Sequence, residues 1–435
     1  MIDNTSVLIY ASTITNRLRY TLDLMLCEFA NISVNYTTEK DYFLKYPSAK
    51  INYSFDKIAN ELIFIKSHTL LFEKNIDKKN IDEIFKNSND EDLFAKVFLC
   101  ISRYEEYNLK ATDFDSHARF SATKSFAQCY GFLQKPMVHI WVNKLFTQLE
   151  NHYPNLIFKK PIYNFQPTFD IDIAWQFKNR SLLRSSIGFV KDAIKLRFFS
   201  VNERLKSLNN NYSDAYDTFG TIKSIHSGEV QPIYFWLLGD YGRFDKNVYW
   251  KTPALQNLIR ETAKENTVGI HPSYKTNRNN KQLLKEIKRL ETITGQKITQ
   301  SRQHFLKLSL PDTYRKLIAA GISDDYSMGY SDNIGFRAGM ATSFYWFDLE
   351  RDEVTNLKIH PFQVMDVTLK NYLKLSPEAA INAVKKIAEE VRAVNGEFCT
   401  LWHNTSLSKT EEWNGWTKVY EEIVNSVTPL SFLVF

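Results

Sequence analysis

Two carboxylates end an apolar stretch near the middle of the chain. Residues 168–172 (TFDID) overlap the end of the strand-like run 163–169. Side chains alternate along a strand, so Asp170 and Asp172 are expected on the same side, and two adjacent carboxylates attract a cation. D-x-D pairs are also common at strand ends, so a structural or solvated role is an equal alternative for this pattern alone.

Three of the nine histidines lie in or at the ends of other predicted strands. They are His271 in GIHPSY (269–274), His304 in SRQHFL (301–306) and His403 in FCTLWHN (398–404). A histidine in such a place can present one ring nitrogen to a metal while the other meets a carboxylate or a carbonyl. Taken alone, His271 also fits a capped loop histidine, the segment of His304 a surface ion pair, and His403 a structural histidine. The set of three, together with the aspartate pair, predicts a functional site.

The elements that would position these residues alternate between strand-like and helix-like segments. The strand-like segments of the second half are 163–169, 232–238, 267–270, 302–308, 322–324, 357–359 and 397–402, and the helix-like segments include 281–294, 312–320 and 377–394. This rhythm predicts parallel βαβ units, in which ligands bind at the carboxyl edge of the strands. The strand 302–308 would place Arg302 and His304 on one face.

The first half predicts a smaller α/β unit. Residues 6–11 and 62–65 are strand-like, and residues 16–29 carry apolar side chains at helical spacing. We therefore expect two domains, an N-terminal α/β domain at 1–155 and a second domain at 161–435.

The order of the motifs TFDID, GIHPSY, SRQHFL, AGISDDYSMGY and TLWHN resembles the polysaccharide deacetylase family, the NodB-like carbohydrate esterases. The resemblance covers about residues 161–410. The N-terminal motifs SRYEEY and HARFSA are similar to a domain that precedes the deacetylase domain in some Bacteroidetes proteins. The resemblance implies a distorted (β/α) barrel and a divalent metal, commonly zinc. The implied reaction is the removal of acetyl groups from N-acetylated sugars.

The resemblance also implies roles for individual residues. Asp170 would be the general base and Asp172 a metal ligand. His271 would be a second ligand, Arg302 would orient the base, and His403 would be the general acid. Either acid of the pair 324–325 could hold that histidine in the required tautomer.

The sequence departs from the family at two motifs. The second motif normally supplies two histidines four residues apart, but Lys275 stands at the second position. The third motif normally has proline after its arginine, and this chain has Gln303 and then His304. We infer that His304 is the third ligand beside Asp172 and His271, a set that suits zinc with an open position. The competing interpretation is a metal site that has decayed.

Four further residues are candidates for substrate binding: Asp240, Tyr274, Arg337 and Trp402. Asp240 lies in a glycine-containing segment after a predicted strand, which a simple turn also explains. For Arg337, in GFRAG (335–339), a salt bridge in a loop is the alternative.

Composition excludes several classes of protein. With 435 residues, 44% hydrophobic and 24% charged, the chain is neither disordered nor a coiled coil. The net charge of +6 is too small to indicate a nucleic-acid binder. The four cysteines are far apart, the N-terminus lacks the pattern of a signal peptide, and no apolar run is long enough to span a membrane. We expect a cytoplasmic protein.

One segment accounts for the whole net charge. Residues 178–206 contain eight basic and two acidic side chains among apolar residues. Such a basic insertion is a candidate contact for an anionic membrane surface or a lipid-linked glycan, while a helical pair with its lysines in water is the plainer alternative.

These observations lead to one expected function and two alternatives. We expect metal-dependent deacetylation of an N-acetylated sugar or polysaccharide precursor. A non-catalytic sugar-binding protein on the same barrel is favoured by Lys275, and a metal-dependent glycosyltransferase would use the pair Asp170 and Asp172.

Overall fold

The computed structural model describes residues 4–429 except 61, 78, 87–91, 108, 160, 181–185, 187–193, 197, 208–212 and 229. The first part forms a parallel four-stranded sheet in the order β2-β1-β3-β4. Its strands are β1 (Ser6–Ala11), β2 (Ser33–Thr37), β3 (Lys50–Ser54) and β4 (Ile63–Lys66). Its helices are α1 (Asn16–Leu22), α2 (Lys40–Lys45), α3 (Lys79–Lys86), α4 (Leu93–Ile101), α5 (Phe126–Cys129) and α6 (Met137–His152).

The second part is built on a nine-stranded sheet in the order β10-β11-β9-β8-β7-β6-β5-β13-β12. All its neighbours pair in parallel except β10 and β11. The strands are β5 (Asn164–Ile171), β6 (Ile233–Trp236), β7 (Val268–Ile270), β8 (Gln300–Ser301), β9 (Asp324–Asp325), β10 (Phe344–Asp348), β11 (Glu353–Ile359), β12 (Val364–Met365) and β13 (Glu397–His403). The predicted α/β class with parallel strands is therefore confirmed.

The predicted barrel is not closed by strand pairing. Among the described strands, β10 and β12 are the two ends of the sheet and do not pair with each other. Irregular backbone lies beside β12 and β13, where Phe362 N donates to Met328 O (3.0 Å) and Gln363 N donates to Cys399 O (3.0 Å). A separate buried cluster draws side chains from β6, β12 and β13, among them Phe235 and Leu401. The sheet thus surrounds a small core without forming a complete ring.

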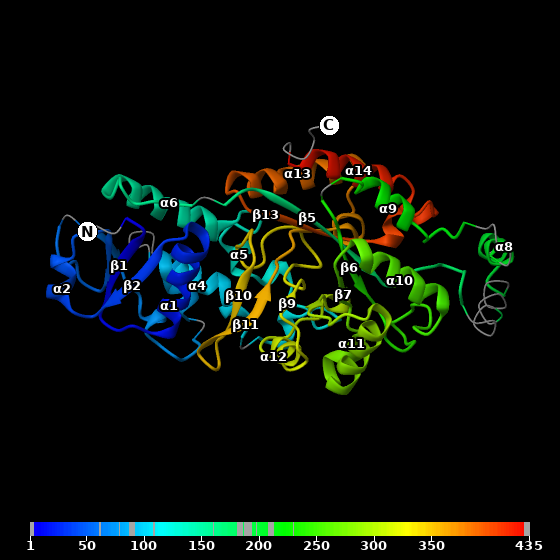
Figure 1. The fold of residues 1–435 in the computed structure, drawn as a ribbon, viewed down its shortest axis with the longest axis horizontal. Helices are drawn as coiled ribbons and strands as arrows, with labels where there is room; N and C mark the ends of the chain where they lie inside the picture. The colour runs from blue at the N-terminus through cyan, green and yellow to red at the C-terminus, as the bar shows by residue number, and fades with distance from the viewer. Residues whose placement is uncertain are drawn as a thin grey trace.

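The helices of the second part lie outside this sheet. They are α8 (Phe198–Lys206), α9 (Phe219–Ile225), α10 (Pro253–Glu265), α11 (Asn280–Thr294), α12 (Asp312–Ala319), α13 (Pro377–Ala393) and α14 (Trp416–Val427). Figure 1 shows α13 and α14 together along one side of the molecule and α10, α11 and α12 on another. Proline at the start of α10 and of α13 fits the first helical turn, where its missing N–H is not needed.

The prediction of a strand at 302–308 is wrong. Strand β8 ends at Ser301, and His304–Leu306 form a 3₁₀ turn. Phe305 and Leu306 have φ of +61° and +52°, in the left-handed region. The backbone leaves the sheet here, so Arg302 and His304 are placed by a turn and not by strand alternation.

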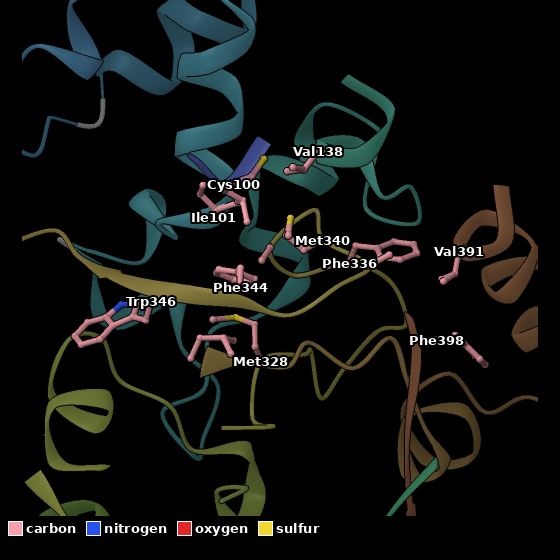
Figure 2. Packing of buried hydrophobic residues seen from close by; sticks show 14 of the residues in the cluster. Cys100, Ile101, Val138, Met328, Phe336, Met340, Phe344, Trp346, Val391 and Phe398 are labelled. Carbon is pink, nitrogen blue, oxygen red and sulfur yellow. The ribbon is translucent and has the colours of Figure 1, made fainter. Parts of the chain in front are cut away.

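The two parts share one hydrophobic core. A single buried cluster contains residues of both sheets. In Figure 2, Cys100 and Ile101 of α4 and Val138 of α6 lie beside Met340 and Phe344 of the second part. The proposed division into domains at 155–161 stays a prediction, and the continuous core indicates that the two parts fold against each other.

The segment GFRAG (335–339) connects the two parts through backbone hydrogen bonds. Phe336 N donates to Leu133 O (2.9 Å), and Val138 N donates to Gly339 O (3.1 Å). A Cβ atom on Gly335 would lie 2.3 Å from Leu133 O, and the φ of +136° at this position also requires glycine. The motif therefore forms part of the interface between the two parts of the chain.

A buried ion network lies in the same interface. Glu106 accepts hydrogen bonds from Arg103 Nε (2.8 Å) and Arg337 Nε (2.9 Å), and all three side chains are buried. Burial alone would raise the pKa of Glu106, but the Arg337 and Arg103 guanidinium groups outweigh it and lower the pKa. The prediction that Arg337 binds substrate is corrected, because its side chain is held in this interface.

Residues 181–185, 187–193 and 197 of the basic insertion 178–206 lie outside the described residues. Within the described part, Ile194, Leu196, Phe198 and Leu205 are exposed large apolar side chains. Figure 1 shows α8 at one end of the molecule. Among the described residues, no helix has the length and hydropathy needed to cross a membrane.

The interface network yields a prediction about stability. Glu106→Gln leaves the buried guanidinium groups of Arg103 and Arg337 without a full counter-charge, so we expect the free energy of unfolding to fall by about 3–5 kcal/mol. Glu390→Gln is the matched control, because Glu390 pairs with Lys135 at an exposed position, where an ion pair contributes at most about 1 kcal/mol. Urea unfolding of both variants measures the difference. Equal losses would contradict the role assigned to the network.

Candidate active site

A cavity of about 170 Å³ opens where the strands β5, β12 and β13 and the turns after β7 and β8 meet. The polar side chains that line it are Arg119, Asp170, Asp172, His271, His304, Tyr372 and His403, and the apolar ones are Phe305, Leu306, Met365, Val367 and Leu401. Arg119 comes from the N-terminal part, and the other residues come from the second part. The sequence prediction of Asp170, Asp172 and three histidines around one site thus has a geometric counterpart.

Asp172 lies between two imidazoles. Its Oδ1 is 3.1 Å from His271 Nε2, and its Oδ2 is 3.4 Å from His304 Nε2. One ligand atom from each of the three residues can be chosen so that all lie within 4.8 Å of one another. Ligands in a tetrahedral zinc site lie about 3.4 Å apart, given bond lengths of about 2.0–2.2 Å. Asp172 Oδ1 is buried and receives no hydrogen bond of acceptable geometry from the described residues. The three side chains therefore fit a metal ion.

The outer nitrogens of both histidines have partners that fix the rings. His271 Nδ1 lies 2.6 Å from Arg302 O, and His304 Nδ1 lies 3.0 Å from Asp245 Oδ1. A carbonyl or carboxylate at Nδ1 leaves Nε2 as the nitrogen that faces a metal. Burial alone would lower the pKa of His304, but the Asp172 and Asp245 carboxylates outweigh it and raise the pKa to about 9. Without a metal, His304 is therefore a cation at neutral pH.

The neighbouring histidines also stabilise the ionised form of Asp172. Burial would raise its pKa, but His304 and His271 outweigh burial and hold the pKa well below its ordinary value. The carboxylate is consequently ionised throughout the physiological range, as a metal ligand must be.

Asp170 lies on the other side of the same edge. It is buried, its Oδ1 accepts from Arg302 Nη1 (3.1 Å), and its Oδ2 lies 3.7 Å from His271 Nε2. Arg302 also donates to Thr168 Oγ1 (2.6 Å) and Tyr326 O (2.9 Å), so its guanidinium is rigidly placed. Oδ1 of Asp170 is therefore engaged by Arg302, while Oδ2 lies nearer to the imidazole of His271.

His403 closes the cavity next to Asp170. Strands β13 and β5 pair in parallel with His403 opposite Asp170. His403 Nε2 lies 3.8 Å from Asp172 Oδ2, and Nδ1 lies 2.9 Å from Asp366 Oδ1. Burial would lower the pKa of His403, but the carboxylates, that of Asp366 first, outweigh it and raise the pKa to about 10. The imidazole is therefore protonated at neutral pH and can donate a proton.

The residue that orients His403 is Asp366, and the prediction of an acid at 324–325 is wrong. Asp324 Oδ1 lies 2.8 Å from His360 Nε2, and Asp325 accepts from Ser301 Oγ (2.7 Å). Both acids are thus engaged with other partners. Asp366 reaches His403 because β12 pairs with β13, with Met365 opposite Leu401.

The predicted substrate-binding residues do not line the cavity. Trp402 is fully buried, since neighbours in a strand face opposite sides and His403 takes the cavity side. Tyr274 packs against Phe244, with 4.3 Å between ring centroids. Asp240 forms ion pairs with Lys285 and Arg289. The structure thus places Trp402 in the core, as it places Arg337 in the interface, and substrate binding by Asp240 and Tyr274 stays a prediction.

Lys275 is exposed and also lies outside the cavity lining. Position 275 therefore does not reach this pocket, whereas His304 lies beside Asp172.

Four side chains at or next to the cavity were missed by sequence reasoning: Asp245, Asp366, Arg119 and Tyr372. Asp245 lies only five residues after the predicted Asp240, in the same connection after β6. The other three come from segments outside the five motifs of the second half, and their approach depends on strand pairing and on contact between the two parts.

This chain is only distantly similar to the known proteins that it matches. A family model described as a family of unknown function, DUF7033, matches residues 7–154, which is less than half of the chain. No curated protein matches the sequence.

The solved structures that match this chain do so at low identity and low TM-score. A protein of Mycobacterium smegmatis assigned as a polysaccharide deacetylase has 12% identity and a TM-score of 0.39, covering 61% of this chain and 84% of its own. The polysaccharide deacetylase Bc1974 of Bacillus cereus has 12% identity and a TM-score of 0.29, with 62% and 87% covered. A 4-alpha-glucanotransferase of Thermococcus litoralis has 11% identity and a TM-score of 0.35, with 63% and 40% covered. Likenesses this distant assign no activity to the chain.

The pair His403 and Asp366 gives a prediction about protonation. Asp366→Asn removes the carboxylate that favours the imidazolium, so the pKa of His403 should fall from about 10 toward the ordinary value of about 6.5. Titration of the histidine ring signals by NMR in the metal-free protein measures it. Asp324→Asn is the control, because Asp324 pairs with His360 and its loss should leave His403 unchanged. A His403 pKa that stays near 10 in Asp366→Asn would refute the assignment.

Proposed function

We propose that this protein is a metal-dependent deacetylase that acts on an N-acetylated sugar or polysaccharide precursor. The observation that carries the proposal is the convergence of three groups on one cavity: the set Asp172, His271 and His304, the buried pair Asp170 and Arg302, and the protonated His403. The motif order of the sequence supports the same chemistry. Zinc suits the two imidazoles and one carboxylate.

The side chains would divide the reaction between them. A zinc ion held by Asp172, His271 and His304 would polarise the acetyl carbonyl and acidify a water molecule. Asp170, held by Arg302, would accept a proton from that water. His403, charged at neutral pH, would donate a proton to the leaving amine, with Asp366 holding the ring. The products would be acetate and a free amino sugar.

The size and lining of the cavity support the binding of a small acyl group. Ligand pockets for drug-sized molecules are commonly about 300–1,000 Å³, and this cavity of about 170 Å³ is smaller. Apolar side chains, including Leu306, Met365 and Leu401, form one wall. An acetyl methyl group fits such a wall, while the sugar would remain toward the opening.

The alternatives fit the cavity less well. A glycosyltransferase needs the D-x-D carboxylates for a metal bound to a nucleotide sugar, yet Asp172 is engaged with two histidines and Asp170 with Arg302. A non-catalytic sugar-binding protein has no use for a protonated histidine held by a buried carboxylate. Contact between segment 178–206 and an anionic lipid or lipid-linked glycan stays a prediction.

Metal content tests the ligand set. We expect wild-type protein to bind about one zinc ion per chain and Asp172→Ala and His304→Ala to bind it far more weakly, because a ligand is lost. Asp240→Ala is the control, since Asp240 lies outside the cavity lining. Equilibrium dialysis followed by elemental analysis provides the measurement. Stoichiometric zinc in all four proteins would exclude this ligand set.

Acetate release tests the reaction. Asp170→Asn should lower kcat on N-acetylated oligosaccharides by about 10²–10⁴-fold, as expected for the loss of a general base, while the protein retains zinc. Asp324→Asn should have full activity, because its partner His360 is not part of the cavity. Enzymatic assay of acetate gives the rates. Consumption of a nucleotide sugar without release of acetate would instead favour the transferase.

A further inference from the structure

The N-terminal motif HARFSA (117–122) reaches the candidate active site. Arg119 lines the cavity although it belongs to the first part of the chain. Its Nη1 donates to Phe305 O (3.3 Å), and its Nη2 donates to Tyr372 Oη (2.6 Å). Phe305 and Tyr372 both line the cavity as well. One wall of the site is therefore shared between the two parts of the chain.

The turn that Arg119 contacts carries His304 and has an unfavourable backbone. Phe305 and Leu306 follow directly, with φ of +61° and +52°. Two successive residues with a Cβ in the left-handed region are rare. Such a conformation persists only where the surroundings hold it. The residue that holds this turn thereby also fixes the imidazole of His304.

A second contact from the same motif supports the turn from the side. The ring of His117 lies 4.7 Å from that of Phe305, and its Nδ1 lies 3.4 Å from Tyr274 Oη. Phe244 completes the aromatic group, 5.3 Å from Phe305. Phe305 is thus held by Arg119 at its carbonyl and by His117 at its ring.

Asp115 orients the side chain of Arg119 for this contact. Its Oδ1 accepts from His117 N (2.8 Å) and from Arg119 N (3.0 Å), and its Oδ2 accepts from Arg119 Nε (2.7 Å). The guanidinium is consequently oriented and neutralised by its own loop. Its remaining N–H groups donate to Phe305 O and Tyr372 Oη. A planar guanidinium with several donors can hold a backbone carbonyl in this way.

We propose that Arg119 is a positioning residue for the metal-ligand turn 304–306, so that the N-terminal part completes the candidate active site. The inference rests on the proposed function, because it takes His304 as a ligand. It gives the N-terminal part a specific role in that function. By stabilising the strained turn, this part allows His304 to stand where the family's second-motif histidine would otherwise be needed.

Metal affinity and hydrogen exchange test this proposal on the full-length protein. Arg119→Ala should weaken the binding of Zn²⁺, measured by competition with a chromogenic chelator, by about 10–100-fold, the usual effect of losing a group that orients a ligand. In the metal-free protein, amide exchange in residues 302–308 should become faster. Arg119→Lys keeps the charge without the planar fork and should resemble Arg119→Ala more than wild type.

The matched control is Ser121→Ala. Ser121 belongs to the same motif and donates to Asp332, so its loss weakens the same interface without touching the turn. It should leave zinc affinity and exchange at 302–308 at wild-type values. Wild-type values in Arg119→Ala, or equal losses in Arg119→Ala and Ser121→Ala, would overturn the proposal. If wild-type protein bound no zinc, the proposed function would fail, while the exchange data would still decide whether Arg119 holds the turn.

Discussion

The candidate site depends on the charge of one carboxylate. Asp172 faces the Nε2 atoms of His271, His304 and His403 at 3.1, 3.4 and 3.8 Å. In the absence of a metal, the protonated imidazoles of His304, with a pKa of about 9, and His403, with a pKa of about 10, balance this charge together with the charges of Asp245 and Asp366. A metal ion that uses His304 must displace its proton, so metal affinity and pH are linked. The same carboxylate thus organises the protonated site and would also organise the site with a metal bound.

The backbone around Asp172 is set by the parallel sheet. β5 delivers Asp170 and leads into Asp172, β7 ends just before His271, and β13 ends at His403. Because carboxyl ends of parallel strands meet at one edge, residues far apart along the chain become neighbours. The N-terminal part stabilises this edge from outside, through a continuous core and the buried ion pair of Glu106 with Arg337. The two parts of the chain therefore pack together around the frame of the site.

Sequence patterns predicted the elements better than the contacts between them. The apolar run 6–11 and the run before Asp170 became β1 and β5, because a strand leaves its signature in consecutive residues. Asp366 had no such signature, since it approaches His403 only through the pairing of β12 with β13. Trp402 was misassigned although alternation in its own strand turns it away from His403 and toward the core. Arg337 was misassigned because its partner, Glu106, lies 231 residues away in the N-terminal part.

The position of His304 shows why motif spacing alone is a poor guide to this site. β7 and β8 are adjacent, with Ile270 opposite Ser301. His271, the first residue after β7, and His304, the third residue after β8, therefore reach the same cavity. A ligand can therefore be supplied by either connection, provided that the backbone can turn the side chain inward. After β8 that turn has positive φ at Phe305 and Leu306, which neighbouring groups must stabilise. The geometry of the sheet edge is therefore the main constraint, and the sequence position of a third candidate ligand depends on which turn the surrounding contacts can hold.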